Sequence, residues 1–156
     1  SVKGNLLDGW IFPWKPKPFE SWAVVDDPFS ESGKCVRMTR TAAEKDAFAV
    51  VQYLPEMKPD TQYLLTFAVR VEGLVLSPGS RHAGVVANIW DDKNVWFPKN
   101  YYTSDMGWTR QGFKFTSGPK TNTPPHKSYV RLAISEAACT AWFGDVKLTE
   151  AASNKE

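Results

Sequence analysis

Short β-prone runs separated by turn residues constrain the fold of this chain more than any other feature. The runs are rich in β-branched and aromatic residues, and clusters of Gly, Pro, Asn, Asp and Ser lie between them. No stretch keeps a 3.6-residue apolar period, and Thr41–Ala49 is expected to be a loop or one short helix. The predicted strands are Asn5–Leu7, Ser21–Val25, Cys35–Thr39, Phe48–Leu54, Gln62–Glu72, Ala83–Asp91, Val95–Pro98, Thr109–Thr116, Tyr129–Ser135 and Ala141–Thr149. This pattern predicts an all-β, two-sheet antiparallel β-sandwich (jelly roll) of about ten strands.

The length of 156 residues is that of a single domain. We assign residues 1–150 to one β-sandwich domain and the small, polar segment 151–156 to a linker-like tail. The chain begins Ser1-Val2-Lys3-Gly4, as a mature or excised segment would, and contains no apolar run long enough to predict a membrane helix. A net charge of +2 is too small to predict nucleic acid or an acidic membrane as the main partner.

Alternation along three of the predicted strands separates an apolar face from a polar one. The outward set includes Arg70, Asn88, Trp90, Arg131 and Ser135. If the three strands share a sheet, these side chains form a polar surface that contains a flat aromatic ring. An error of one residue in register would turn a whole set to the opposite face.

Residues arranged for catalysis are scarce. The two histidines, His82 and His126, belong to no zinc-binding or nucleophile motif, and the chain has no Gly-rich phosphate loop. Two adjacent Asp pairs, at 26–27 and 91–92, could supply the two carboxylates of a glycosidase. Each pair lies in a predicted turn, where Asp is favoured for its backbone geometry. We therefore expect no catalytic residues and no enzymatic activity.

The chain contains seven Trp residues, and several are difficult to bury. We assign Trp22, Trp108 and Trp142 mainly to the core and leave Trp10 undecided. The remaining three, Trp14, Trp90 and Trp96, lie in polar loops or on a predicted outer face. Clustered exposed aromatics are typical of a binding surface, and the apolar face of a sugar ring packs well on an aromatic ring.

The two cysteines, Cys35 and Cys139, allow two interpretations. Buried free thiols are the usual state inside a cell, whereas one disulfide is typical of an exported β-domain. The residues alone leave both open.

Five motifs, spread over almost the whole chain, occur in an order that resembles a known group of proteins. They are Asn5-Leu6-Leu7-Asp8-Gly9, Ser32-Gly33-Lys34, Gln52 with the Lys58-Pro59-Asp60-Thr61-Gln62-Tyr63 turn, Trp108-Thr109-Arg110, and Trp142-Phe143-Gly144-Asp145-Val146-Lys147-Leu148. The chain thereby resembles the carbohydrate-binding modules of families 4, 9, 16 and 22, which share a galactose-binding-like jelly roll.

The resemblance implies a non-catalytic module attached to a secreted glycoside hydrolase. It also implies a disulfide between Cys35 and Cys139. A structural Ca²⁺ is implied at Asp145 and Gly33, with Asp8 as a further ligand, since oxygen ligands suit this cation. The closing motif of this chain has one carboxylate fewer than the Phe-Asp-Asp of the family.

The resemblance and the strand alternation together imply a binding site on a concave sheet face. Its floor would be Gln52, Arg70, Asn88, Trp90 and Arg131, and its aromatic rims would be Trp14 and Trp96. We therefore predict a secreted, monomeric module that binds a polysaccharide or oligosaccharide and targets a glycoside hydrolase in cis. The alternatives are a polysaccharide lyase or hydrolase on the same fold, and an adhesion or assembly domain that binds protein.

Overall fold

The computed structural model describes residue 10 and residues 16–54, 57–90, 96–97, 101–119 and 128–151. These residues form nine strands: β1 (Glu20–Asp26), β2 (Lys34–Arg40), β3 (Ala47–Tyr53), β4 (Gln62–Leu76), β5 (Gly84–Trp90), β6 (Trp96–Phe97), β7 (Met106–Thr116), β8 (Tyr129–Ser135) and β9 (Ala137–Glu150). Each matches a predicted strand, while the tenth, Asn5–Leu7, lies outside the described residues. Residues 41–46 form a loop, and no described helix is long and apolar enough to cross a membrane.

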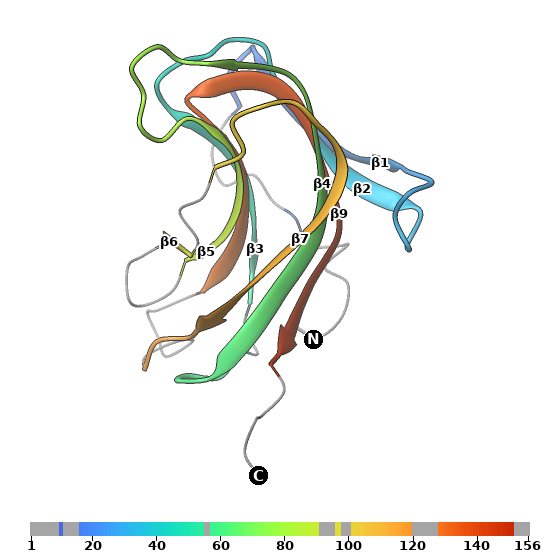
Figure 1. Ribbon diagram of the computed structural model, residues 1–156, viewed down its shortest axis with the longest axis vertical. Helices are drawn as coiled ribbons and strands as arrows, with labels where there is room; N and C mark the ends of the chain where they lie inside the picture. The colour runs from blue at the N-terminus through green and yellow to red at the C-terminus, as the bar shows by residue number, and fades with distance from the viewer. Residues whose placement is uncertain are drawn as a thin grey trace.

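The strands form two antiparallel sheets that pack face to face (Figure 1). One sheet has the order β1-β2-β9-β4-β7, and the other has the order β3-β8-β5-β6. Both sheets bow in the same direction in Figure 1, so the outer face of the four-stranded sheet is the hollow side. The predicted all-β sandwich is confirmed.

The core lies between the two sheets and is built by alternation along the strands, which a bulge interrupts in β9. Leu65, Val69 and Phe143 of the five-stranded sheet face Val50 and Leu132 of the four-stranded sheet in one buried cluster. Trp10, which the sequence left undecided, belongs to this core, and Trp22 packs against it.

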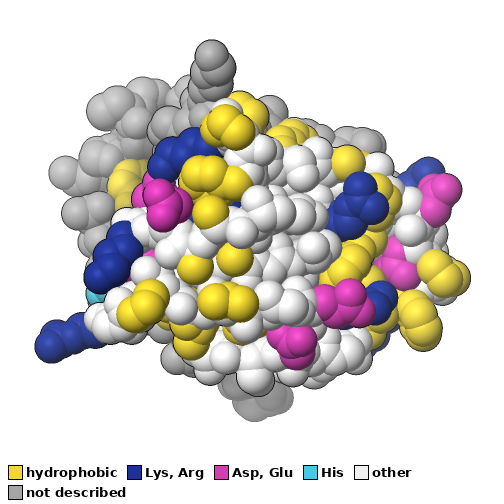
Figure 2. Space-filling view, turned by 90° about the horizontal axis from the view of Figure 1, so that it is seen from above, with side chains coloured by type: hydrophobic (Ala, Val, Ile, Leu, Met, Phe, Trp, Pro, Cys, Tyr) yellow, Lys and Arg dark blue, Asp and Glu magenta, His cyan; other side chains and the backbone are white. Residues whose placement is uncertain are grey.

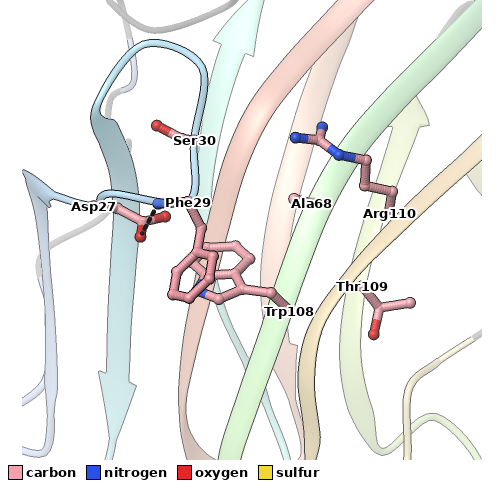
Figure 3. Close-up of a pocket in the computed structure, with 7 residues that line it drawn as sticks. All are labelled: Asp27, Phe29, Ser30, Ala68, Trp108, Thr109 and Arg110. Carbon is pink, nitrogen blue, oxygen red and sulfur yellow. Dashed lines mark hydrogen bonds between the residues drawn. The ribbon is translucent and has the colours of Figure 1, made fainter.

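Trp108 and Trp142 do not lie in the core, so this part of the sequence interpretation is wrong. In β9, Phe143 points inward, and the adjacent Trp142 must therefore point outward, where the Arg70 guanidinium lies 4.6 Å from its ring centroid. In β7, Trp108 lies beside Phe29 on the outer side of the five-stranded sheet (Figure 3). The aromatic content alone did not distinguish these positions from core positions.

The predicted disulfide is also wrong: both cysteines are free and buried. In the β2–β9 ladder Cys35 lies opposite Gly144, whereas Cys139 lies opposite Arg40. The two are therefore five positions apart along the ladder, about 17 Å at 3.3 Å per residue, far beyond the reach of a disulfide. They also lie on opposite faces, since Cys139 is in the core and Cys35 alternates with the core residues Val36 and Met38.

One end of the core is closed by a buried arginine, Arg40, which is 1% exposed. Its guanidinium donates to Glu20 Oε2 at 3.1 Å, to the Asp46 carboxylate, and to the Ala137 carbonyl at 3.2 Å. The Phe19 ring lies 5.4 Å from its centre. Arg40 thereby connects β1, β2 and β9 with the loop that leads into β3.

Figure 2 shows the molecule from above the view of Figure 1, the end where β4 ends. Neither positive nor negative charge dominates this surface. Hydrophobic side chains lie there singly or in small groups among Lys, Arg, Asp and Glu. The Lys and Arg total of 19 against 17 Asp and Glu agrees with this mixed surface.

The Arg40→Ala substitution should lower the free energy of unfolding by about 3–5 kcal/mol, because the buried Glu20 carboxylate would lose the cation that it pairs with. Urea denaturation monitored by Trp fluorescence measures this loss. The double variant Arg40→Met/Glu20→Gln should recover part of it. A loss below about 1 kcal/mol for Arg40→Ala would show that the network contributes little.

The native chain should react very slowly with Ellman's reagent at pH 8. Burial raises the pKa of Cys35 to about 11 and that of Cys139 to about 12, so both stay as unreactive thiols. Reactivity should rise only as the pH approaches these values. After denaturation without reductant, both thiols should react with the reagent. If neither thiol reacts under these conditions, the two cysteines form a disulfide after all.

Candidate functional site

Three aromatic side chains form a row across the outer face of the four-stranded sheet. Tyr53 of β3 and Trp90 of β5 both lie opposite Tyr129 of the central strand β8, so all three point to the same side. The Trp90 and Tyr129 rings stack with centroids 5.5 Å apart and planes 18° apart. Tyr53 meets Tyr129 edge-on at 5.7 Å and is 45% exposed. We call these three residues the aromatic row.

Two polar side chains lie in the next row of the same face. Arg131 of β8 is paired with Asn88 of β5 and with Val51 of β3. Burial is the main cause that lowers the pKa of Arg131, and it also raises the pKa of the neighbouring Tyr129. The polar row thus places a guanidinium and an amide beside the aromatic row.

Asn88 has an unusual environment for an amide. Its side chain is 1% exposed, and no described residue donates a hydrogen bond to its Oδ1 atom. A buried carbonyl oxygen without a donor is costly, so this atom would gain from a donor supplied by a bound molecule or by water.

Beyond the polar row, the face becomes apolar. Ala49, Val86 and Ala133 are buried there, and Tyr101 packs against them. Tyr101 precedes Tyr102, whose backbone exchanges two hydrogen bonds with Val85 at 2.7 and 3.0 Å. This short bridge holds Tyr101 next to the apolar part of the face.

The structure brings together three of the seven predicted binding residues: Asn88, Trp90 and Arg131 share this face, as alternation predicted. The backbone of Trp96 in β6 pairs with Trp90, although its side chain is not described, and Trp14 lies outside the described residues.

Two floor residues were placed wrongly. Arg70 lies in β4, which belongs to the five-stranded sheet, so the assumption that the three strands share a sheet is incorrect. Gln52 is opposite Val130, a core residue, and therefore points to the core side of β3.

Tyr53 and Tyr129 were not among the predicted binding residues, although both lie in the aromatic row. The apolar run Phe48–Val51 hides the alternation of β3, because both faces of this strand are buried there. The signal that could have identified Tyr53 is the Gln52-Tyr53 pair at the end of the strand. Once one of the two points inward, the other must point outward.

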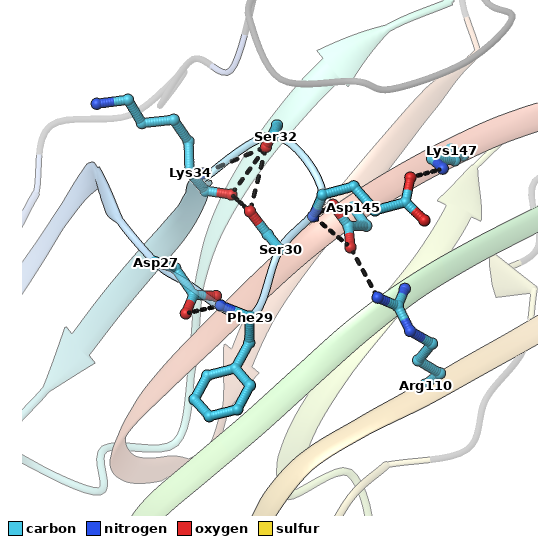
Figure 4. Close-up of polar contacts among 9 residues, drawn as sticks. Asp27, Phe29, Ser30, Ser32, Lys34, Arg110, Asp145 and Lys147 are labelled. Atoms are coloured by element: carbon cyan, nitrogen blue, oxygen red, sulfur yellow. Dashed lines mark hydrogen bonds and ion pairs between the residues drawn. The ribbon is translucent and has the colours of Figure 1, made fainter.

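Asp145, the implied calcium ligand, lies at a bulge in β9. Thr66 is opposite Lys147 and Ala68 is opposite Gly144, so β9 has one extra residue here. Asp145 takes the positive φ of 49° at this bulge, a conformation that Asp tolerates better than most residues. Its carboxylate therefore reaches the loop between β1 and β2 (Figure 4).

The groups around Asp145 do not fit a calcium site. Its two oxygens accept the Glu31 N–H at 2.9 and 3.2 Å, and Oδ2 also accepts Arg110 at 3.1 Å (Figure 4). The Gly33 carbonyl accepts the Asp27 N–H at 2.8 Å, and Asp8 is not described. No group of three or more metal-ligating side chains exists among the described residues. Hydrogen-bond donors face the Asp145 carboxylate and the Gly33 carbonyl, the oxygens that Ca²⁺ would need. The positive charge that pairs with the Asp145 carboxylate is that of Arg110.

Chelation should therefore leave the melting temperature unchanged within about 1 °C. A resident Ca²⁺ present at 100 times its Kd would contribute about 2.7 kcal/mol, which is about 5–10 °C for a domain of this size. Differential scanning calorimetry with EDTA, and then with added CaCl₂, measures the shift. A loss of several degrees that CaCl₂ restores would establish calcium, as the resemblance implied.

No protein-family model and no curated protein sequence matches this chain. Solved structures match it in fold. A family 16 carbohydrate-binding module is 17% identical with a TM-score of 0.56, over 94% of this chain and 93% of that one. A cyclase from Fischerella sp. TAU, solved with an indole compound, is 16% identical with a TM-score of 0.61, over 94% and 86%.

A tailspike protein domain of bacteriophage CBA120 is 9% identical with a TM-score of 0.64. The match covers 94% of this chain, which spans only 20% of the tailspike chain. Carbohydrate-binding modules of families 22 and 4 also match over nearly their whole length. At these identities the likenesses show the fold, the jelly roll that the sequence motifs predicted. Because binding modules and a cyclase share it, the fold alone does not assign the activity.

Proposed function

We propose that this chain is a non-catalytic module that binds a polysaccharide or oligosaccharide on the outer face of its four-stranded sheet. The aromatic row is the observation that carries the proposal. Tyr53, Tyr129 and Trp90 come from three adjacent strands and lie on the hollow side of the bowed sheet. A rigid sheet holds such a platform in place before a ligand arrives, which lowers the entropy cost of binding.

The chemistry of the face suits a sugar chain. A sugar ring has an apolar C–H face that packs on an aromatic ring, and hydroxyl groups at its edge that need hydrogen-bond partners. The Arg131 guanidinium can donate to ring or hydroxyl oxygens, while Asn88 Oδ1 can accept from a hydroxyl. Neighbouring strands lie about 4.8 Å apart, so rings from three strands offer a surface longer than one sugar unit.

The likeness to carbohydrate-binding modules over nearly their full length supports this proposal. So does a putative sugar-binding protein from Bacteroides thetaiotaomicron with a TM-score of 0.59 at 11% identity. By analogy with such modules, the proposal extends to a secreted monomer that keeps an attached glycoside hydrolase on its substrate.

Tyr53→Ala and Trp90→Ala should each weaken polysaccharide binding about two- to tenfold, because each removes one stacking surface worth about 0.5–1.5 kcal/mol. Affinity electrophoresis against soluble β-glucans, xylan, mannan and uronic-acid polymers identifies the ligand, and calorimetry then gives the Kd. Val75→Ala is the matched control, since Val75 is 60% exposed on β4 of the other sheet.

The proposal fails if no polymer of the panel binds, or if both aromatic variants bind as tightly as the parent. Prolonged incubation with the bound polymer should release neither reducing ends nor unsaturated products. Their appearance would identify a hydrolase or a lyase instead. Capture of a protein partner that sugars do not displace would favour an adhesion domain.

A further inference from the structure

A second concave site lies on the opposite side of the molecule. A cavity of about 240 Å³ opens between the loop that joins β1 to β2 and the outer face of β4 and β7. Asp27 and Phe29 of the loop line it together with Trp108 and Arg110 of β7, and the Phe29 ring lies beside the Trp108 ring (Figure 3). The aromatic row lies on the other sheet, so the two sites are separate.

Asp27 gives this cavity an acceptor that is not used. Its side chain is 6% exposed, and Oδ1 accepts the Phe29 N–H at 3.0 Å. No residue in the described part of the chain donates to Oδ2. A buried carboxylate oxygen without a donor is costly, and a ligand hydroxyl would remove that cost.

Two aromatic rings supply an apolar surface in the same cavity. The Phe29 and Trp108 centroids lie 6.4 Å apart with planes tilted by 38°, and both rings line the cavity. Phe29 is 68% exposed, the largest exposure among the large hydrophobic side chains described. Such exposure at a cavity mouth is typical of a binding surface.

Arg110 restricts the charge of the ligand. Its guanidinium binds Asp145 through one nitrogen, Nη2, and most of its side chain remains exposed. The Asp27 carboxylate would repel an anionic ligand, and the Arg110 guanidinium would repel a cationic one. A neutral ring that carries both donors and acceptors satisfies both groups without repulsion.

We propose that this cavity is a second carbohydrate site, which binds one neutral sugar unit. The ring would pack on Phe29 and Trp108, with a hydroxyl donating to Asp27 Oδ2 and an oxygen accepting from Arg110. The cavity is smaller than the roughly 300–1,000 Å³ of sites for drug-sized ligands, which suits a single ring rather than a chain segment. This site goes beyond the proposed function and does not depend on the aromatic row.

The test is a titration of the ¹⁵N-labelled full chain with cellopentaose, xylopentaose, mannopentaose and laminaripentaose, followed by NMR. At least one of the four should shift the backbone amides of residues 29, 30, 109 and 110 in a saturable way. Phe29→Ala should raise the Kd read from these amides about tenfold or more. Val75→Ala, a second exposed apolar residue away from the cavity, should leave that Kd unchanged.

The second site is refuted if no pentasaccharide shifts these amides, or if Phe29→Ala leaves their titration unchanged. The amides of the aromatic row report on the proposed function separately. Shifts at the cavity without shifts at the row would support the second site and contradict the first. Shifts at the row alone would do the reverse. Because Phe29 is so exposed, its truncation should leave the fold intact, which circular dichroism checks.

Discussion

The antiparallel pairing of β4 with β9 is the constraint on which the rest of the structure depends. These two longest strands pair from Tyr63 opposite Glu150 to Leu76 opposite Ala137, in the middle of the five-stranded sheet. β2 is added on the β9 side and β7 on the β4 side. The register of this pair therefore decides which side chains of four strands enter the core.

Several local features follow from that register and its bulge. The register directs Phe143 into the core and Trp142 to the Arg70 side of the sheet. The extra residue at the bulge turns Asp145 toward the β1–β2 loop, where it accepts hydrogen bonds from Glu31 and Arg110. Lys147, further along β9, pairs with Glu31 and lowers the pKa of its carboxyl group. Among the described residues, an arginine and a backbone donor thus hold this loop by hydrogen bonds to the carboxylate that a Ca²⁺ ion would need.

The strands and the alternating faces of β5 and β8 could be predicted from the sequence, because period-two alternation is a local property. Sheet membership could not. Arg70 has the same outward alternation as Asn88, yet β4 pairs with β9 and not with β8, a long-range choice without a local signal. The resemblance also implied a disulfide between Cys35 and Cys139, and only the ladder register shows that they lie too far apart. The sequence therefore placed Asn88, Trp90 and Arg131 correctly on one face, and it misplaced Arg70, which lies in the second sheet, and Gln52, which lies in an apolar strand.

The central claim is that the aromatic row holds a sugar chain. The most direct test is a crystal structure of the chain with the oligosaccharide that a glycan array selects. The account predicts sugar rings stacked on Tyr53, Tyr129 and Trp90, with a hydroxyl within hydrogen-bond distance of Asn88 Oδ1. An oligosaccharide bound only elsewhere on the molecule, with this face in contact with no sugar, would contradict it.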